Sequence, residues 1–372
     1  QNAGADAYNT AVGHNAGKDV TTGIYNTLIG ALAGDALTDA DLNVAVGQGA
    51  LTTDTKGGKS VAIGYAALSA QNFTTSTDSF NTAIGYEVAA AATTARYNSI
   101  IGAYAGDALD TGGGHTVLGY SALTTETSGG NCVAIGTHAL NTQNVGGGTN
   151  VMNTACGYSS GYAVTSGIRN TFIGAYAGDG TDDGSSNVAV GAETLSANCG
   201  DHNTVVGNNA GNLLTSSNNT LIGSRVGDAL TVGELNTAVG DQALTTDDVG
   251  SRCVAVGYYA LGAQNAPGST ANNYGINLFQ QADFNALQID NSNNANRAAY
   301  IYTSKSSAAT ELVTILSDST TFGKAALLVR NDDADQSTIQ VNGGLGVVLN
   351  DTAVGVSGSQ YSTGSFGRVE AS

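Results

Sequence analysis

A five-residue pattern of polar and apolar positions recurs along the first two thirds of the chain. Its first copy is Asn9–Gly13, Asn-Thr-Ala-Val-Gly, and 15 such pentads align, with an apolar residue or cysteine at positions three and four. Successive copies are mostly 17 residues apart, with two steps of 21 and two of 16. So short a repeat cannot hold a helical hairpin or a propeller blade, and it predicts one turn of a β-solenoid per pentad.

The alternation within each pentad predicts which side chains are buried. Neighbouring side chains of a strand point to opposite faces, so positions two and four share one face and position three lies on the other. Positions two and four are mostly β-branched, and we therefore expect them to fill the interior of a narrow roll. Cys156, at position four, should then point inward. The apolar third positions would form an exposed stripe, which predicts self-association of parallel chains.

The first and last pentad positions predict how the coils stack and turn. Position one is Asn in 11 of 15 copies, and stacked Asn side chains can hydrogen-bond along a ladder. Gly and Asn also tolerate the left-handed backbone of tight corners. The pentad residues to which we assign a structural role are Asn9, Val12, Gly13, Asn26, Ile29, Gly30, Ile63, Gly64, Ile84, Gly85, Ile135, Gly136, Ile173, Gly174, Ile222, Gly223, Val256 and Gly257.

A longer period of four coils is superimposed on the pentad repeat. Shortly after the pentad glycine, the first two coil types of each set mostly read Ala-Gly, as at Ala33-Gly34. The third and fourth types mostly read Ala-Leu, as at Ala50-Leu51. Along the chain, two complete sets of four coil types are followed by a set of three and a further set of four. This order indicates block duplication with one deletion.

The pentads end before residue 267, and the rest of the chain does not continue the repeat. We assign residues 1–266 to the β-roll, 267–276 to a linker and 277–372 to a β-rich domain. Short β-type runs in the last segment are too small to form cores of their own. They predict an intertwined, multi-chain β-structure.

Charge and composition narrow the function classes. There are 12 Lys and Arg against 30 Asp and Glu, a net charge of −18, which disfavours nucleic acid as a partner. No run of 18 apolar residues occurs, so membrane insertion is not expected. No nucleophile elbow is present and the acids lie in predicted turns, so we expect neither an enzyme nor a cofactor. The first residue is Gln, which predicts a processed product or a fragment.

Aspartates after several pentads are the one candidate for metal chemistry. They could bind Ca²⁺ or Mg²⁺, and the alternative is that they are solvated turn residues. The candidate ligands are Asp35, Asp107, Asp179, Asp183 and Asp228.

The cysteines and histidines carry no predicted chemistry. We expect four free thiols, because Cys132 and Cys253 hold the same pentad position seven coils apart, too far for a disulfide. The four histidines have no recurring metal spacing and are expected to be surface or ladder residues.

The pentad resembles the Asn-Ser-Val-Ala-Ile-Gly repeat of trimeric autotransporter adhesin heads. Ser60–Gly64 and Cys132–Gly136 match it well, and the resemblance covers residues 9 to about 265. It implies a left-handed parallel β-roll and a homotrimer. The coils here are longer than that family's, so their loops should project further. The segments after residue 268 resemble phage tail-fibre shafts, in which a natural processing end at Ser372 would fit.

The sequence therefore predicts an all-β homotrimer: a parallel β-solenoid of about 15 coils followed by an intertwined shaft or tip. We expect a structural and adhesive phage tail fibre on the virion, with two further copies, other tail proteins and a host receptor or glycan as partners. The alternatives are the head of a bacterial trimeric surface adhesin, extracellular on the cell surface, and a polysaccharide-degrading tailspike. Ice binding by the repeated Thr is disfavoured while Thr is expected to face inward.

Overall fold

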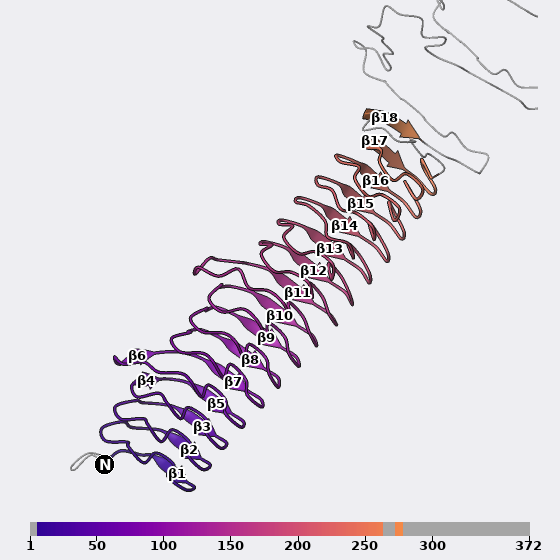
Figure 1. Ribbon diagram of the computed structural model, residues 1–372. Coiled ribbons are helices and arrows are strands. Elements are labelled where there is room, and N and C mark those ends of the chain that lie inside the picture. The colour runs from indigo at the N-terminus through magenta and orange to yellow at the C-terminus, as the bar shows by residue number, and fades with distance from the viewer. Residues whose placement is uncertain (1–5, 263–271, 278–372) are drawn as a thin grey trace, which may run out of the picture. The chain divides into compact units, whose positions relative to one another are not determined.

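The computed structural model describes residues 6–262 and 272–277, which belong to one compact unit, Gln1–Gln288. The predicted parallel β-solenoid of about 15 coils is confirmed, and the described residues contain no helix. Each coil contributes one short strand to a 16-stranded sheet in which strand order follows chain order (Figure 1). Successive coils therefore pair only with their immediate neighbours.

The strands of the large sheet have three residues each, apart from the last two, which have six. In order they are β1 (Thr10–Val12), β2 (Thr27–Ile29), β3 (Val44–Val46), β5 (Val61–Ile63), β7 (Thr82–Ile84), β8 (Ser99–Ile101), β9 (Thr116–Leu118), β10 (Val133–Ile135), β11 (Thr154–Cys156), β12 (Thr171–Ile173), β13 (Val188–Val190), β14 (Thr204–Val206), β15 (Thr220–Ile222), β16 (Thr237–Val239), β17 (Ser251–Val256) and β18 (Asn272–Asn277).

Two smaller features complete the described architecture. β4 (Gly57–Gly58) and β6 (Thr77–Asp78) form a separate two-stranded parallel sheet. β18 pairs with β17 and overlaps the segment that the sequence assigns to a linker. The predicted β-rich domain lies outside the described residues after Asn277.

The coils stack in register, so each pentad position becomes a column along the solenoid. Thr10 pairs with Thr27, and Ala11 with Leu28, at the first step. The same register is kept across the steps of 21 and 16 residues, for example between β10 and β11 and between β13 and β14. The extra or missing residues are therefore absorbed outside the strands.

The prediction of which face is buried is wrong, and the structure reverses it. Position three points inward: from Leu28 to Ala255 every member of that column is at most 1% exposed, and only Ala11 in the first coil is open. Positions two and four point outward, and Cys156 is exposed rather than internal. The reason is volume. The interior is so narrow that nine of the 15 third positions are Ala, whereas the bulkier β-branched residues fit outside.

The predicted asparagine ladder is confirmed. The backbone N–H of Asn43 donates to Oδ1 of Asn26 at 2.9 Å, and that of Ser60 donates to Oδ1 of Asn43 at 2.8 Å. Each side-chain amide also donates to a carbonyl 13 or 14 residues further on, as Asn43 Nδ2 does to Gly57 O at 2.8 Å. Position one thus satisfies backbone groups that the three-residue strand leaves unpaired.

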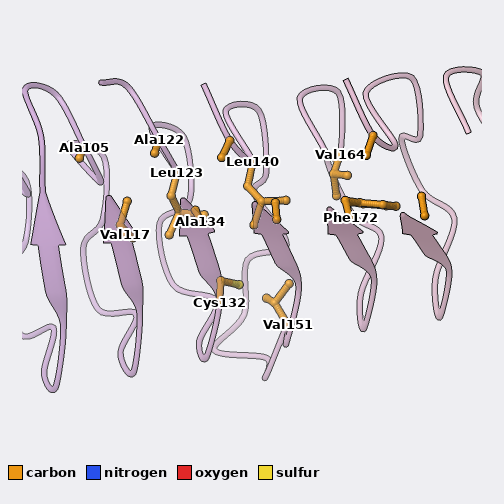
Figure 2. Close-up of a cluster of buried hydrophobic side chains, with 14 of the residues drawn as sticks. Ala105, Val117, Ala122, Leu123, Cys132, Ala134, Leu140, Val151, Val164 and Phe172 are labelled. Atoms are coloured by element: carbon orange, nitrogen blue, oxygen red, sulfur yellow. The ribbon is translucent and has the colours of Figure 1, made fainter. Parts of the chain in front are cut away.

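Two ways of filling the interior explain the Ala-Gly and Ala-Leu coil types. In Ala-Gly coils, a Cβ on Gly34 would lie 2.7 Å from Leu37 Cδ1, so the leucine three residues later occupies the space. In Ala-Leu coils the leucine itself is buried, as are Leu51 and Leu123. Figure 2 shows Leu140, the leucine of an Ala-Leu coil, and Phe172, at pentad position three, directed into the coils. The Ala-Gly and Ala-Leu pairs therefore indicate which residue fills the interior of each coil.

The pentad glycine is required by close approach between coils. Gly102 has φ of +140°, and a Cβ there would lie 2.2 Å from the carbonyl oxygen of Gly119 in the next coil. No side chain fits without separating the coils, so this column admits only glycine.

Replacing a ladder asparagine should destabilise the solenoid. Asn43→Ala removes the acceptor of the Ser60 N–H and the donor to Gly57 O, both buried, and should lower the free energy of unfolding by roughly 1–3 kcal/mol. Urea unfolding followed by circular dichroism measures this. Asn208→Ala, at an exposed position, is the control and should change it by less than about 0.5 kcal/mol. Equal effects of the two substitutions would contradict the ladder's role.

Candidate functional site

The outward face of the large sheet is an apolar stripe made of pentad positions two and four. Position four is Val, Ile or Leu in every coil except that of Cys156, and position two is Thr in nine coils, Val in five and Ser in one. Ile29, Ile101 and Ile173 are 40%, 41% and 42% exposed. We call these two columns the outward stripe. A continuous apolar surface of this kind is typical of an interaction surface.

A second exposed feature is a row of aromatic side chains directly after the strands. They occupy the first or second position after the pentad glycine in successive coils from β5 to β12. Adjacent ring centroids lie 5.0 to 6.5 Å apart. The members of this aromatic row are Tyr65, Tyr86, Tyr104, Tyr120, His138, Tyr158 and Tyr176.

The row ends in a shallow groove of about 360 Å³. Tyr162 joins the row here, with its ring centroid 6.2 Å from that of His138. Rings form most of the wall, and Ser159 and Asp179 add a hydroxyl and a carboxylate. The lining residues are His138, Tyr158, Ser159, Tyr162, Tyr176 and Asp179.

Asp179 is the one carboxylate among the groove residues, and it is partly buried. Burial raises the pKa of its carboxyl group, and its Oδ1 atom has no hydrogen-bond partner. The aromatic row was not predicted from the sequence, although aromatic residues recur at the first or second position after successive pentad glycines.

The aspartates proposed as metal ligands are not brought together. Asp35, Asp107, Asp179 and Asp228 occupy the same place in four coils that are three or four coils apart, roughly 14 to 19 Å. Asp35 instead accepts a hydrogen bond of 2.6 Å from Thr52 Oγ1, and Asp183 is exposed. In residues 6–262 and 272–277 there is no cluster of three or more His, Cys, Asp or Glu that could hold a metal ion.

Buried acids, by contrast, occur where the sequence analysis expected none. Asp54 and Glu126 lie three residues after the buried leucines of two Ala-Leu coils, at the position that Leu37 holds in an Ala-Gly coil, and both are fully buried. Gln71 in the following coil donates to Asp54 at 2.6 Å, and Gln143 donates to Glu126 at 3.1 Å. Backbone N–H groups complete both sites, so these acids stabilise the stack rather than line a ligand site.

Two of the cysteines are shielded members of the ladder. Cys132 and Cys253 hold position one and are buried, and burial raises the pKa of each thiol to about 11. Such thiols are poor nucleophiles near neutral pH. Cys156 is the exposed cysteine and lies in the outward stripe.

His115 replaces asparagine in the ladder and has a defined tautomer. Its Nδ1 atom lies 3.2 Å from the Cys132 backbone N–H, and its Nε2 atom lies 2.8 Å from Gly129 O. Because the first partner only donates and the second only accepts, the ring must be neutral with its proton on Nε2. Burial lowers the pKa of His115, an effect partly opposed by Gly129 and by the charge of Glu126.

Comparisons with known proteins do not assign a family: no protein-family model matches the chain, and no curated protein matches it either. The described segments contain no helix of sufficient length and apolarity to span a membrane. The interpretation of function therefore depends on the exposed surfaces.

His115 should make stability depend on pH in a predictable direction. Its folded-state pKa lies below the unfolded value near 6.5, so its contribution is complete above pH 6.5 and is lost as the pH falls below it. His115→Asn keeps both hydrogen-bonding roles and should flatten this acid-side loss in unfolding midpoints. His202→Asn, at an exposed position, should retain it. An unchanged pH profile in His115→Asn would contradict the assignment.

Proposed function

We propose that the chain forms a homotrimeric fibre with a structural and adhesive role. In this proposal the fibre is part of the tail of a phage virion. The observation that carries the proposal is the outward stripe, which runs the length of the described solenoid. Three parallel copies would cover it by packing their stripes around a common axis. Its partners would be two further copies of itself, other tail proteins and a host surface receptor or glycan.

The proposed association surface differs from the one that the sequence predicted. Position three is inside the coil and cannot contact another chain, whereas positions two and four can. Self-association is therefore still favoured, but through the opposite face of the strands. Ile, Val and Leu in one column and Thr and Val in the other form a surface whose burial is favourable.

The mechanical role follows from the way the coils are connected. Each coil donates backbone hydrogen bonds to its neighbours, and no edge is open between the first and last coils. Unfolding of an assembled fibre would require the separation of three stripes before the coils could part. Persistence would then be set by an unfolding rate.

The head of a bacterial surface adhesin would also be a homotrimeric β-roll, and the resemblance of the pentads supports it equally. The resemblance of residues after 268 to fibre shafts favours the phage assignment. For a polysaccharide-degrading tailspike, paired carboxylates in a groove would be needed, and the groove described above has the single carboxylate of Asp179.

The structure adds one argument for the ice-binding hypothesis, because the nine position-two threonines face outward rather than inward. The neighbouring column is wholly apolar apart from Cys156, however, and five coils have Val in place of Thr. That composition favours a stripe covered by protein. A monomer with the stripe open to water would favour ice binding instead.

Charge placed in the outward stripe should prevent assembly without disturbing the coils. Light scattering of the intact chain should give a mass near three times 37.0 kDa, with resistance to heating in detergent. The double substitution Ile101→Asp and Ile173→Asp should reduce the mass to one chain, because three carboxylates would meet near the axis at each of two levels.

The matched control changes two apolar residues of similar exposure away from the strands. Leu213 and Val232 are 50% and 56% exposed, and their replacement by Asp should leave the mass at three chains. Circular dichroism checks that both variants keep their β-structure. A monomeric wild-type chain, or a stripe variant that still forms trimers, would refute the proposed interface.

A further inference from the structure

The groove at the end of the aromatic row has the composition of a site for a neutral, hydroxyl-rich ligand. Ring carbons of Tyr158, Tyr162 and Tyr176 offer apolar surface, and Tyr158 and Tyr176 have ring centroids only 5.2 Å apart. These three side chains are 49%, 42% and 42% exposed, so a ligand can reach them. Amphipathic rings of this kind bind ligands that are apolar on one face and polar at the edge.

Polar groups at the groove supply directional contacts. The tyrosine hydroxyls and Ser159 can donate or accept hydrogen bonds, and the Asp179 carboxylate accepts them. No Lys or Arg lines the groove, and the whole chain has a net charge of −18. An anionic ligand is therefore disfavoured, whereas a ligand with several hydroxyl donors matches the acceptors present.

The length of the aromatic row indicates an extended ligand. Rings follow one another from Tyr65 to Tyr176, one or two per coil, with no gap larger than 6.5 Å between neighbouring centroids. A chain of repeating units can place one apolar face on each ring in turn. A small isolated molecule would use only the groove.

We propose that the aromatic row is a binding track for a neutral oligosaccharide or polysaccharide, with the groove around Tyr158, Tyr176 and Asp179 as its anchoring site. Pyranose rings have apolar C–H faces and hydroxyl edges, which match the rings and the polar groups respectively. This inference deepens the proposed attachment function and depends on it for its biological role. It identifies the residues that would contact a host-surface glycan.

A small organic cation is the main competing occupant. Aromatic rings and a carboxylate can bind ammonium groups, but such sites surround the charge with ring faces. Here His138 and Tyr162 meet at 83° and Tyr158 and Tyr176 at 76°, so ring edges alternate with faces along an open wall. The groove has one carboxylate and no enclosure, which favours the saccharide.

The test is a calorimetric titration of the intact chain with short neutral oligosaccharides of glucose, mannose, galactose and N-acetylglucosamine. Tetramethylammonium ion is the cationic probe and inorganic phosphate the anionic one. At least one saccharide series should bind, and Tyr158→Ala with Tyr176→Ala should weaken it by about tenfold or more. Asp179→Asn should weaken it less, because the amide oxygen still accepts a hydrogen bond.

The control is Tyr8→Ala with Tyr25→Ala. These rings are also exposed, and their centroids lie 5.3 Å apart, but they lie outside the row, so affinity should not change. The absence of saccharide binding, binding of tetramethylammonium alone, or equal affinity in the Tyr158 and Tyr176 variant would overturn the proposal. Native mass is measured on the same samples. A monomer that binds saccharide would refute the trimer alone, and a trimer that binds none would refute the track alone.

Discussion

In-register stacking of near-identical coils is the constraint from which the other features follow. Once Thr10 pairs with Thr27 and each later strand repeats that register, every residue faces its own counterpart in the next coil. A position is then a column with one shared environment. The asparagine ladder makes this register specific, because Oδ1 of each position-one Asn accepts a hydrogen bond from the position-one backbone N–H of the next coil, as at Asn26 and Asn43. A slip of one residue would put these amides outside and leave the N–H groups unpaired.

The strands, their register, the coil number and the ladder could all be predicted from spacing and composition. The choice of buried face could not be made from hydrophobicity alone, because both faces are apolar. The residues at pentad positions one and three could have identified the buried face. Asn at position one shares a face with position three, and a ladder amide is effective only when shielded from water. Ala is the commonest third residue, which indicates a narrow interior, whereas Ile and Val at position four need more room.

The candidate sites differ in the same way: part of them could be predicted from the sequence and part could not. Tyr65 to Tyr176 follow pentad glycines, so the aromatic row is a sequence pattern that a column-by-column reading would have found. The groove depends on how Ser159, Asp179 and the surrounding rings pack in space, which spacing does not reveal. The buried pairs of Asp54 with Gln71 and Glu126 with Gln143 were also missed, because an acid in a repeat of turns suggests solvent. Only the stacked coils show that an amide lies above each acid.

The four native cysteines test the reversed face assignment, on which the outward stripe and the proposed trimer both depend. The direct measurement is brief alkylation of the folded chain, followed by mass spectrometry, in wild type and in the Ile101→Asp and Ile173→Asp variant. The account predicts that Cys132, Cys199 and Cys253 stay unmodified in both. Cys156 should be protected in the wild-type trimer and modified rapidly in the variant. Rapid modification of Cys132 and Cys253, or protection of Cys156 in a monomer, would contradict it.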